Sequence, residues 1–152
     1  PAYMRTSRPK TSVIYSPDET FPIGGLKVLR ESDRDVATVI GAGVTVFEAL
    51  TAYEQLQAEG ISIRVVDLYS VQPVDKETLI RCGQATKGSL ITVEDHYING
   101  GIGDAVAAAV ASAGLTVRRL AICEIPRSGK PAELLDRYGI SAKHIVAAVK
   151  SQ

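Results

Sequence analysis

The sequence has few of the side chains that build metal centres and redox sites. Its 152 residues include only two histidines and two cysteines, and the H-E-x-x-H pattern of zinc hydrolases is absent. The cysteines, Cys82 and Cys123, have no C-x-x-C spacing and lie on different expected elements, so we interpret them as small apolar side chains. We therefore expect no metal site and no nucleophilic site built on histidine.

The chain also lacks an excess of charge and a long hydrophobic run. Seventeen lysines and arginines balance 17 aspartates and glutamates, so no bulk field attracts nucleic acid or an anionic membrane. No apolar run approaches the roughly 20 residues of a membrane span, and the N-terminus has no apolar signal-peptide core. We expect no nucleic-acid partner, no membrane partner and a cytoplasmic location.

The first residues differ in composition from the rest of the chain. Four of the seven prolines lie within residues 1–22, and proline at that density is incompatible with a helix. We predict an extended arm and linker over residues 1–22, with extended pieces at 2–6 and 12–15, and one folded domain over residues 23–152. The domain begins with a candidate edge strand at 26–31.

From residue 36 onwards, short apolar runs alternate with helical patterns. Strands are predicted at 36–40, 61–66, 90–93 and 115–122, and helices at 44–59, from 75, at 104–113, from 131 and from 142. The order strand, glycine turn, helix, glycine, strand occurs twice, over 37–66 and over 90–122, which predicts parallel strands joined by right-handed crossovers. The expected fold class is therefore α/β, a three-layer sandwich with a mostly parallel sheet flanked by helices.

Three residues are typical helix boundaries in this pattern. Gly60 is placed to end the helix at 44–59. Asp75 and Ser141 are placed as N-caps, where a side-chain oxygen accepts a hydrogen bond from a free backbone N–H group.

Acidic residues and a histidine meet a glycine turn at Glu94 to Gly103, after the third strand of this alternation. Glu94, Asp95 and His96 could form an acid–base group, since a histidine exchanges protons near neutral pH. Glu94 and His96 share a direction if the strand continues, because alternate strand residues face the same side. No serine or cysteine has a fixed relation to them, so we favour a structural role or a contact with a partner.

The turn Gly41-Ala42-Gly43, followed by Asp67, resembles part of a dinucleotide-binding pattern. In that pattern an acid about 20 residues after the glycines holds the ribose hydroxyls. The position of the third glycine is taken by Val46, however, and a tight turn between a strand and a helix often has the same appearance. We favour an architectural turn over a nucleotide site.

Two short basic clusters could hold an anion. Arg5 and Arg8 flank Thr6 and Ser7 in the proline-rich arm, and Arg127 and Lys130 precede an expected helix start. Basic residues in loops are usually solvated, and the chain has no P-loop. Its residues alone provide no complete active site.

Four motifs together resemble one enzyme family. They are RTSRP at 5–9, VIGAGVTVFEAL at 39–50, VEDHYINGGIG at 93–103 and PRSGKPAELLDRYGI at 126–140. In this order they are similar to the C-terminal part of transketolase. The resemblance assigns residues 1–22 to the end of the pyrimidine-binding middle domain and the linker, and residues 23–152 to the transketolase C-terminal domain.

The resemblance implies a transferase of ketol groups in the pentose phosphate pathway. The complete enzyme moves a two-carbon unit from a ketose phosphate to an aldose phosphate, using thiamine diphosphate and a divalent metal ion, Mg or Ca. A thiamine diphosphate site is usually marked by GDG and a later asparagine, and this chain has no equivalent. The family implies that the cofactor binds to the N-terminal and middle domains of a homodimer.

The resemblance transfers one site residue to this chain. Arg5, the first arginine of RTSRP, corresponds to an arginine that binds the substrate phosphate, with Arg8 as the other register. No catalytic, cofactor-binding or metal-binding residue is transferred. We expect a chain that is inactive alone and that works with the upstream transketolase domains, in the same chain or in a separate subunit. The alternative is a non-catalytic α/β module that binds a protein partner or a nucleotide.

Overall fold

The structure, a computed structural model, describes residues 10–152. Arg5, Arg8 and the extended piece expected at 2–6 lie outside these residues. The elements in chain order are β1 (Lys27–Arg30), β2 (Thr38–Gly41), α1 (Val44–Ala58), β3 (Arg64–Asp67), α2 (Lys76–Ala85), β4 (Ser89–Tyr97), α3 (Ile102–Val110), a 3-10 turn (Ala111–Ala113), β5 (Thr116–Ile122), α4 (Pro131–Arg137) and α5 (Ala142–Lys150).

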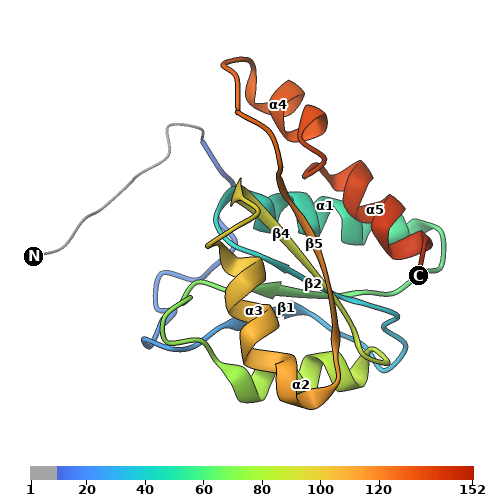
Figure 1. Cartoon of the computed structure of the whole chain (residues 1–152). Helices are drawn as coiled ribbons and strands as arrows, with labels where there is room; N and C mark the ends of the chain where they lie inside the picture. The colour runs from blue at the N-terminus through green and yellow to red at the C-terminus, as the bar shows by residue number, and fades with distance from the viewer. Residues whose placement is uncertain (1–9) are drawn as a thin grey trace, which may run out of the picture.

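The five strands form one sheet in the order β1-β3-β2-β4-β5 (Figure 1). Strand β1 pairs antiparallel with β3 at the edge, and the other three pairs are parallel. The predicted edge strand and the predicted mostly parallel sheet are both confirmed. The strand order changes direction between β2 and β4, which is where open α/β sheets usually bind ligands.

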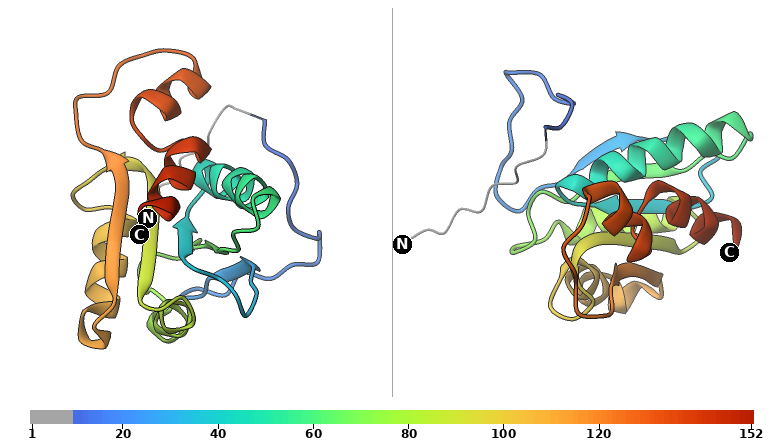
Figure 2. Two further views of the ribbon diagram at one scale, coloured as in Figure 1. Left: turned by 90° about the vertical axis from the view of Figure 1, so that its right-hand side faces the viewer. Right: turned by 90° about the horizontal axis from the view of Figure 1, so that it is seen from above.

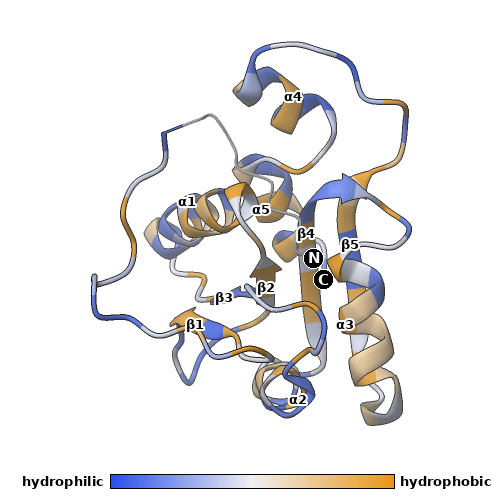
Figure 3. Cartoon of the chain, turned by 90° about the vertical axis from the view of Figure 1, so that its left-hand side faces the viewer, coloured by the Kyte–Doolittle hydropathy of each residue, from blue (hydrophilic) through white to orange (hydrophobic). Residues whose placement is uncertain are grey.

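Apolar residues of the strands face both sides of the sheet and produce two cores. Val39, Val65 and Ile91 pack with α1 and α5, whereas the neighbouring residues Ile40, Val66 and Leu90 pack with α2 and α3. Figure 2 shows the sheet between these helices, and Figure 3 shows apolar residues concentrated along β2 and β4. The predicted three-layer arrangement is therefore confirmed.

Several element bounds differ from the sequence-based expectation. The strand predicted at 61–66 is β3, which starts only at Arg64, because its parallel partner β2 starts at Thr38 and these two residues are in register. The strand predicted at 90–93 is longer in the structure: β4 has nine residues and continues through Glu94, Asp95 and His96 to Tyr97. Helix α3 starts at Ile102, two residues before the predicted start.

The predicted helix boundaries are confirmed at two of three positions. Gly60, which follows the C-cap residue of α1, has φ of 78°, and Asp75 Oδ1 accepts a hydrogen bond from Thr78 N at 3.0 Å. Ser141 precedes α5 as expected but makes no side-chain cap. Instead, Glu48 from α1 accepts a hydrogen bond from Ala142 N at 2.7 Å.

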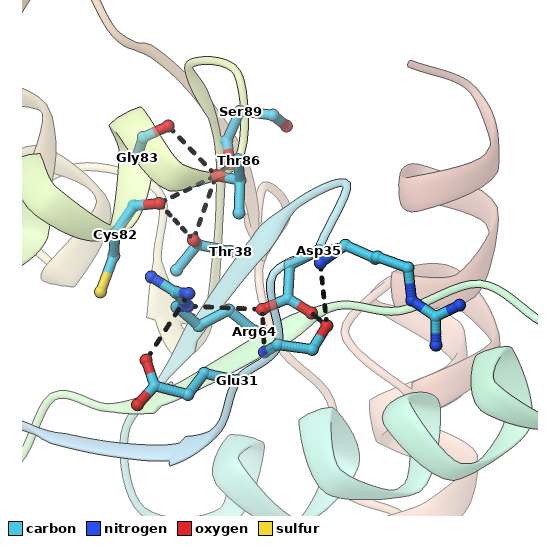
Figure 4. Close-up of polar contacts among 10 residues, drawn as sticks. Glu31, Asp35, Thr38, Arg64, Cys82, Gly83, Thr86 and Ser89 are labelled. Carbon is cyan, nitrogen blue, oxygen red and sulfur yellow. Dashed lines mark hydrogen bonds and ion pairs between the residues drawn. The ribbon is translucent and has the colours of Figure 1, made fainter.

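A largely buried polar cluster around Arg64 and Thr38, the first residues of β3 and β2, is drawn in Figure 4. The Arg64 side chain is 9% exposed, and its Nε lies 3.4 Å from Asp35 Oδ2 and its Nη2 3.5 Å from Glu31 Oε2. Thr38 Oγ1 donates a hydrogen bond to Cys82 O at 3.1 Å. Cys82 lies on the buried face of α2, as the sequence predicted, and Cys123 is exposed after β5; both are free thiols.

Candidate functional site

The acidic turn connects the end of β4 to the start of α3. Glu94 is only 3% exposed, and its Oε1 accepts a hydrogen bond from Gly103 N at 3.0 Å. Burial raises the pKa of the Glu94 carboxyl, and the N–H groups of Gly103 and Ile102 partly offset this rise. The carboxylate therefore caps the first turn of α3, whose free N–H groups favour a negative charge.

Glu94 and His96 face the same side of the turn, as the sequence predicted for a continuing strand. A Cβ atom on Gly101 would lie 1.7 Å from Glu94 Oε2 and 2.9 Å from His96 Nδ1. His96 is exposed, and its Nδ1 lies 2.7 Å from Tyr97 O. Because a carbonyl oxygen only accepts, Nδ1 is the donor in this contact. The two side chains are neighbours, but neither contacts a serine or cysteine nucleophile in the described part of the chain.

The loop between Tyr97 and α3 is fixed by a second acidic residue. Asp104 Oδ2 accepts a hydrogen bond from Gly100 N at 2.6 Å, and Asp104 also forms an ion pair with Arg119 of β5. Arg119 Nη1 donates a further hydrogen bond to Ile98 O at 3.2 Å. These contacts connect the glycine turn to the edge strand, so they give the turn a defined shape.

The turn after β2 fills the point where the strand order changes direction. Thr45, in the first turn of α1, is fully buried, and its Oγ1 contacts Val93 O of β4 at 2.7 Å. A Cβ atom on Gly41 would lie 3.0 Å from the backbone of Thr45. Gly43 has φ of 61°, which glycine adopts without strain. The glycines thus allow close packing of the helix on the sheet, which supports the architectural interpretation of this turn.

Asp67, the acid that a nucleotide site would use, is already engaged. It is 8% exposed at the end of β3, and its Oδ2 accepts a hydrogen bond from Tyr15 OH at 2.6 Å. Burial raises the pKa of Asp67, and the hydrogen bond from Tyr15 acts in the opposite direction. One carboxylate oxygen of Asp67 is therefore already bonded within the chain.

Two surface hollows open at the carboxyl ends of the strands, on either side of Gly43. One, of about 470 Å³, lies against the acidic turn and is lined by Glu94, Asp95 and His96. The other, of about 400 Å³, lies between α1 and α4 and is mostly apolar, with Phe47 and Leu134 among its lining residues. Together they make this end of the sheet an uneven surface.

The basic residues before α4, Arg127 and Lys130, are exposed, and Arg127 contacts the rest of the domain through its backbone N–H group. Arg127 N donates a hydrogen bond to Tyr138 OH at 2.6 Å, and Lys130 forms an ion pair with Glu133 at 3.5 Å. These contacts shape the loop that leads into α4. The structure does not bring Arg127 or Lys130 together with the acidic turn in any hydrogen bond or ion pair among residues 10–152.

The described residues do not assemble a metal centre or a membrane-crossing helix. Over residues 10–152, no group of three or more His, Cys, Asp or Glu side chains is arranged to hold a metal ion. In the same range, no helix combines the length and the apolar character needed to cross a membrane.

Sequence reasoning missed two side chains that shape this end of the sheet, Thr45 and Tyr15. Thr45 lies in the first turn after a glycine, where a hydroxyl often bonds nearby backbone, so the GVT sequence carried a weak signal. Tyr15 gave no signal, because its partner is 52 positions away.

Comparison with known proteins identifies one family. The family described as "Transketolase, C-terminal domain" matches residues 24–145. Transketolase-like protein 2 of Mus musculus is 58% identical over 149 residues, which is 97% of this chain and 24% of that protein. Transketolase of Rattus norvegicus is 53% identical over 149 residues, with the same two shares. The chain thus spans about a quarter of the length of these relatives.

Solved structures give the same result. The structure described as "Split gene transketolase, inactive beta4 tetramer" has a TM-score of 0.85 and 35% identity, and covers 92% of this chain and 46% of that chain. Transketolase from Campylobacter jejuni shares the fold, with a TM-score of 0.65 and 19% identity over 91% of this chain and 20% of that chain. The chain therefore belongs to the transketolase family, in which it represents the C-terminal domain.

Proposed function

We propose that this chain is the C-terminal part of an active transketolase, which transfers a two-carbon ketol unit from a ketose phosphate to an aldose phosphate. The observation that carries the proposal is the continuous match over 97% of the chain to a protein named transketolase. The chain corresponds to 24% of that relative, so the reaction requires the N-terminal and middle domains as well. These upstream domains belong to the same chain or to a separate subunit.

Thiamine diphosphate and its divalent metal ion, Mg or Ca, do not fit the residues described here. Among residues 10–152 no acidic or histidine cluster suits a metal ion, and Thr45 fills the crevice between β2 and β4. We therefore assign the cofactor to the upstream domains and no catalytic step to residues 10–152. In the complete enzyme the cofactor supplies the electron sink, and the protein supplies binding and orientation.

In this proposal the C-terminal domain contributes to assembly. The hollows beside Gly43 and the exposed side chains of Asp95 and His96 would contact a neighbouring domain in a homodimer of the complete enzyme. The structural neighbour described as a split-gene transketolase in an inactive tetramer, of which this chain covers 46%, supports the view that one part of a split transketolase can assemble without being active.

Arg5 is proposed to bind the phosphate of the sugar substrates. It lies outside the described residues, so the proposal rests on the RTSRP motif alone. A guanidinium group can bind a phosphate through two parallel hydrogen bonds, and this remote binding energy positions the sugar for reaction.

The experiment compares Arg5→Ala with the unchanged protein in the complete enzyme. We expect KM for phosphorylated aldoses to rise roughly 10- to 100-fold, since a hydrogen bond to a charged group contributes about 1.5–3 kcal/mol. The KM for unphosphorylated acceptors should stay the same. Arg8→Ala is the matched control, because it removes a guanidinium three positions away. An equal rise for both kinds of substrate contradicts the assignment, and a selective rise in Arg8→Ala alone moves it to the other register.

The alternative function is a non-catalytic module that binds a protein partner. The observation that favours it is the structural neighbour that forms a tetramer described as inactive. In that case the chain should associate with upstream transketolase domains without supporting ketol transfer. A nucleotide partner is less favoured, because Asp67 is engaged by Tyr15.

A further inference from the structure

The hollow against the acidic turn contains a buried hydrogen-bond acceptor without a donor. Glu94 is 3% exposed and lines this hollow of about 470 Å³. Its Oε1 accepts a hydrogen bond from Gly103 N, whereas its Oε2 has no hydrogen-bond partner among residues 10–152. The N–H group of Ile102 lowers the pKa of Glu94 but does not supply that partner. Buried polar atoms in folded proteins nearly always have a partner, so the missing donor calls for an explanation.

The unpartnered oxygen lies on the side of the carboxylate that faces the hollow. A Cβ atom on Gly101 would lie 1.7 Å from Glu94 Oε2 and 2.9 Å from His96 Nδ1, and both Gly101 and His96 line the hollow. Oε2 is covered in this chain alone, and the exposed ring of His96 is the movable side chain beside it. A rotation of this ring is therefore the expected way to open access to Oε2.

The charges around the hollow favour a cation. Glu94 and Asp95 contribute two carboxylates, and no lysine or arginine is among the described residues that line the hollow. Arg119 of β5 is already engaged, because its guanidinium forms an ion pair with Asp104. The starts of α1 and α3 also line the hollow, but the negative charge that they favour is already present in the two carboxylates. Because buried charges in proteins are usually paired, a basic side chain complements this hollow.

The upstream transketolase domains can bring this side chain. The chain spans about a quarter of its relatives, and its family model is described as the C-terminal domain, so most of the complete enzyme precedes it. Thr11, near the start of the described residues, lines the neighbouring hollow between α1 and α4, and the two hollows share Gly43 and Asp95. The described chain therefore enters the domain beside the hollow that contains Glu94.

We propose that Glu94 and Asp95 form a docking site for a basic side chain, an arginine or a lysine, of the upstream transketolase domains. The inference rests on the proposed function and deepens it, because it names the chemistry of one contact in the assembly. The basic side chain enters the hollow beside His96, donates a hydrogen bond to Glu94 Oε2 and pairs with the exposed carboxylate of Asp95. The buried carboxylate of Glu94 thereby gains the partner that it lacks in this chain alone.

The test measures the Kd between this chain and the N-terminal and middle domains of a transketolase by titration calorimetry. Glu94→Gln keeps the size of the side chain and an oxygen for Gly103 N, and places an N–H group where Oε2 stood. We expect Kd to rise about 30-fold or more, because the basic side chain then meets a donor instead of a buried carboxylate. Urea unfolding of the isolated variant checks that the chain is still folded.

Asp95→Asn tests the charge of the partner at an exposed position, where the substitution leaves the fold intact. We expect Kd to rise about two- to fivefold, and this effect to shrink as salt is added. Asp33→Asn is the matched control, because it removes the same charge from an exposed residue in the loop before β2, whereas the hollow lies after β2. It should leave Kd unchanged.

Chemical labelling identifies the partner residue in the complex. Phenylglyoxal modifies arginine and acetic anhydride modifies lysine, and mass spectrometry locates the modified side chains. One basic residue of the upstream domains should be protected in the complex with the unchanged chain and should lose this protection with Glu94→Gln.

The outcomes separate the docking site from the proposed function. An unchanged Kd in folded Glu94→Gln overturns the site, and an equal Kd for Asp95→Asn and Asp33→Asn overturns the choice of a cation. If Glu94→Gln does not fold, the Asp95→Asn comparison decides alone. A complex that shows the expected changes in Kd but no ketol transfer supports the docking site and counts against the proposed function. If the unchanged chain does not bind the upstream domains at all, both fail.

Discussion

At the scale of single residues, Glu94 is the clearest case of a side chain that the local fold explains. Sequence reasoning placed Glu94 and His96 on one side, and the structure confirms it through their common neighbour Gly101. The sequence could not show that Glu94 is buried, because the continuation of β4 to Tyr97 depends on its pairing with β5. Burial and the bond to Gly103 N make this carboxylate a helix cap.

Replacing Gly101 by alanine tests this view of the turn. Gly101 has φ of −97°, which any residue adopts, so glycine is demanded by side-chain contacts: chiefly the Glu94 carboxylate, whose Oε2 would lie 1.7 Å from a Cβ atom, and secondly the exposed His96 ring. We expect Gly101→Ala to lower the free energy of unfolding by about 1–3 kcal/mol through overpacking. The loss of unfolding free energy caused by Gly101→Ala should be smaller in a protein that already carries Glu94→Ala. Gly129→Ala is the control, because its Cβ would approach only the flexible side chain of Leu134, at 3.1 Å. If the losses of unfolding free energy in Gly101→Ala and Glu94→Ala simply add in the double variant, measured by urea unfolding, the steric explanation is refuted.

The pKa of Asp67 gives a pH-dependent prediction. Burial raises this pKa above its ordinary value of 3.8, so the folded state binds the proton more tightly than the unfolded state does. Stability contributed by this group is therefore lost as pH rises from about 3.8 through the folded pKa. Removing the Tyr15 hydroxyl should raise the folded pKa further and enlarge the loss. The difference in unfolding free energy between the unchanged protein and Tyr15→Phe should grow between pH 3 and pH 7; a difference that stays constant with pH would disagree.

At the scale of elements, hydrophobic patterns predicted every helix and strand of the domain, and long-range contacts set the ends. Ile61 and Ile63 have the apolar pattern of a strand, yet β3 starts at Arg64 because β2 offers no partner before Thr38. Asp75 caps its own helix and was predictable from local spacing. The cap of α5 was not, because Glu48 lies 94 positions from Ala142.

Glu48 should therefore contribute more to α5 than Ser141 does. We expect Glu48→Ala to lower the free energy of unfolding by about 0.5–2 kcal/mol, the usual cost of losing a helix cap. Ser141→Ala should cost less, since its Oγ contacts Asp136 and His144 instead of a free N–H group of the helix. Glu54→Ala, on the exposed face of α1, serves as the control. If Glu48→Ala and Ser141→Ala lower the free energy of unfolding equally in urea, Glu48 is not the dominant cap of α5.

At the scale of the whole molecule, the two βαβ patterns were enough to predict a parallel three-layer fold. Adjacent strand residues such as Val65 and Val66 are buried on opposite faces of the sheet, which explains why these strands are apolar throughout instead of alternating apolar and polar residues. The candidate site was less predictable. Its shape depends on contacts between distant residues, and the chain spans only about a quarter of its relatives. The cofactor site and the substrate site are therefore proposals about the complete enzyme.

The most direct measurement of the central claim is reconstitution of ketol transfer. This chain is mixed with the N-terminal and middle domains of a transketolase, thiamine diphosphate and Mg²⁺, and transfer from a ketose phosphate to an aldose phosphate is followed. The account predicts that the chain alone neither binds thiamine diphosphate tightly nor transfers the ketol unit, and that transfer appears in the mixture. A stable complex without ketol transfer, or tight cofactor binding by this chain alone, would contradict it.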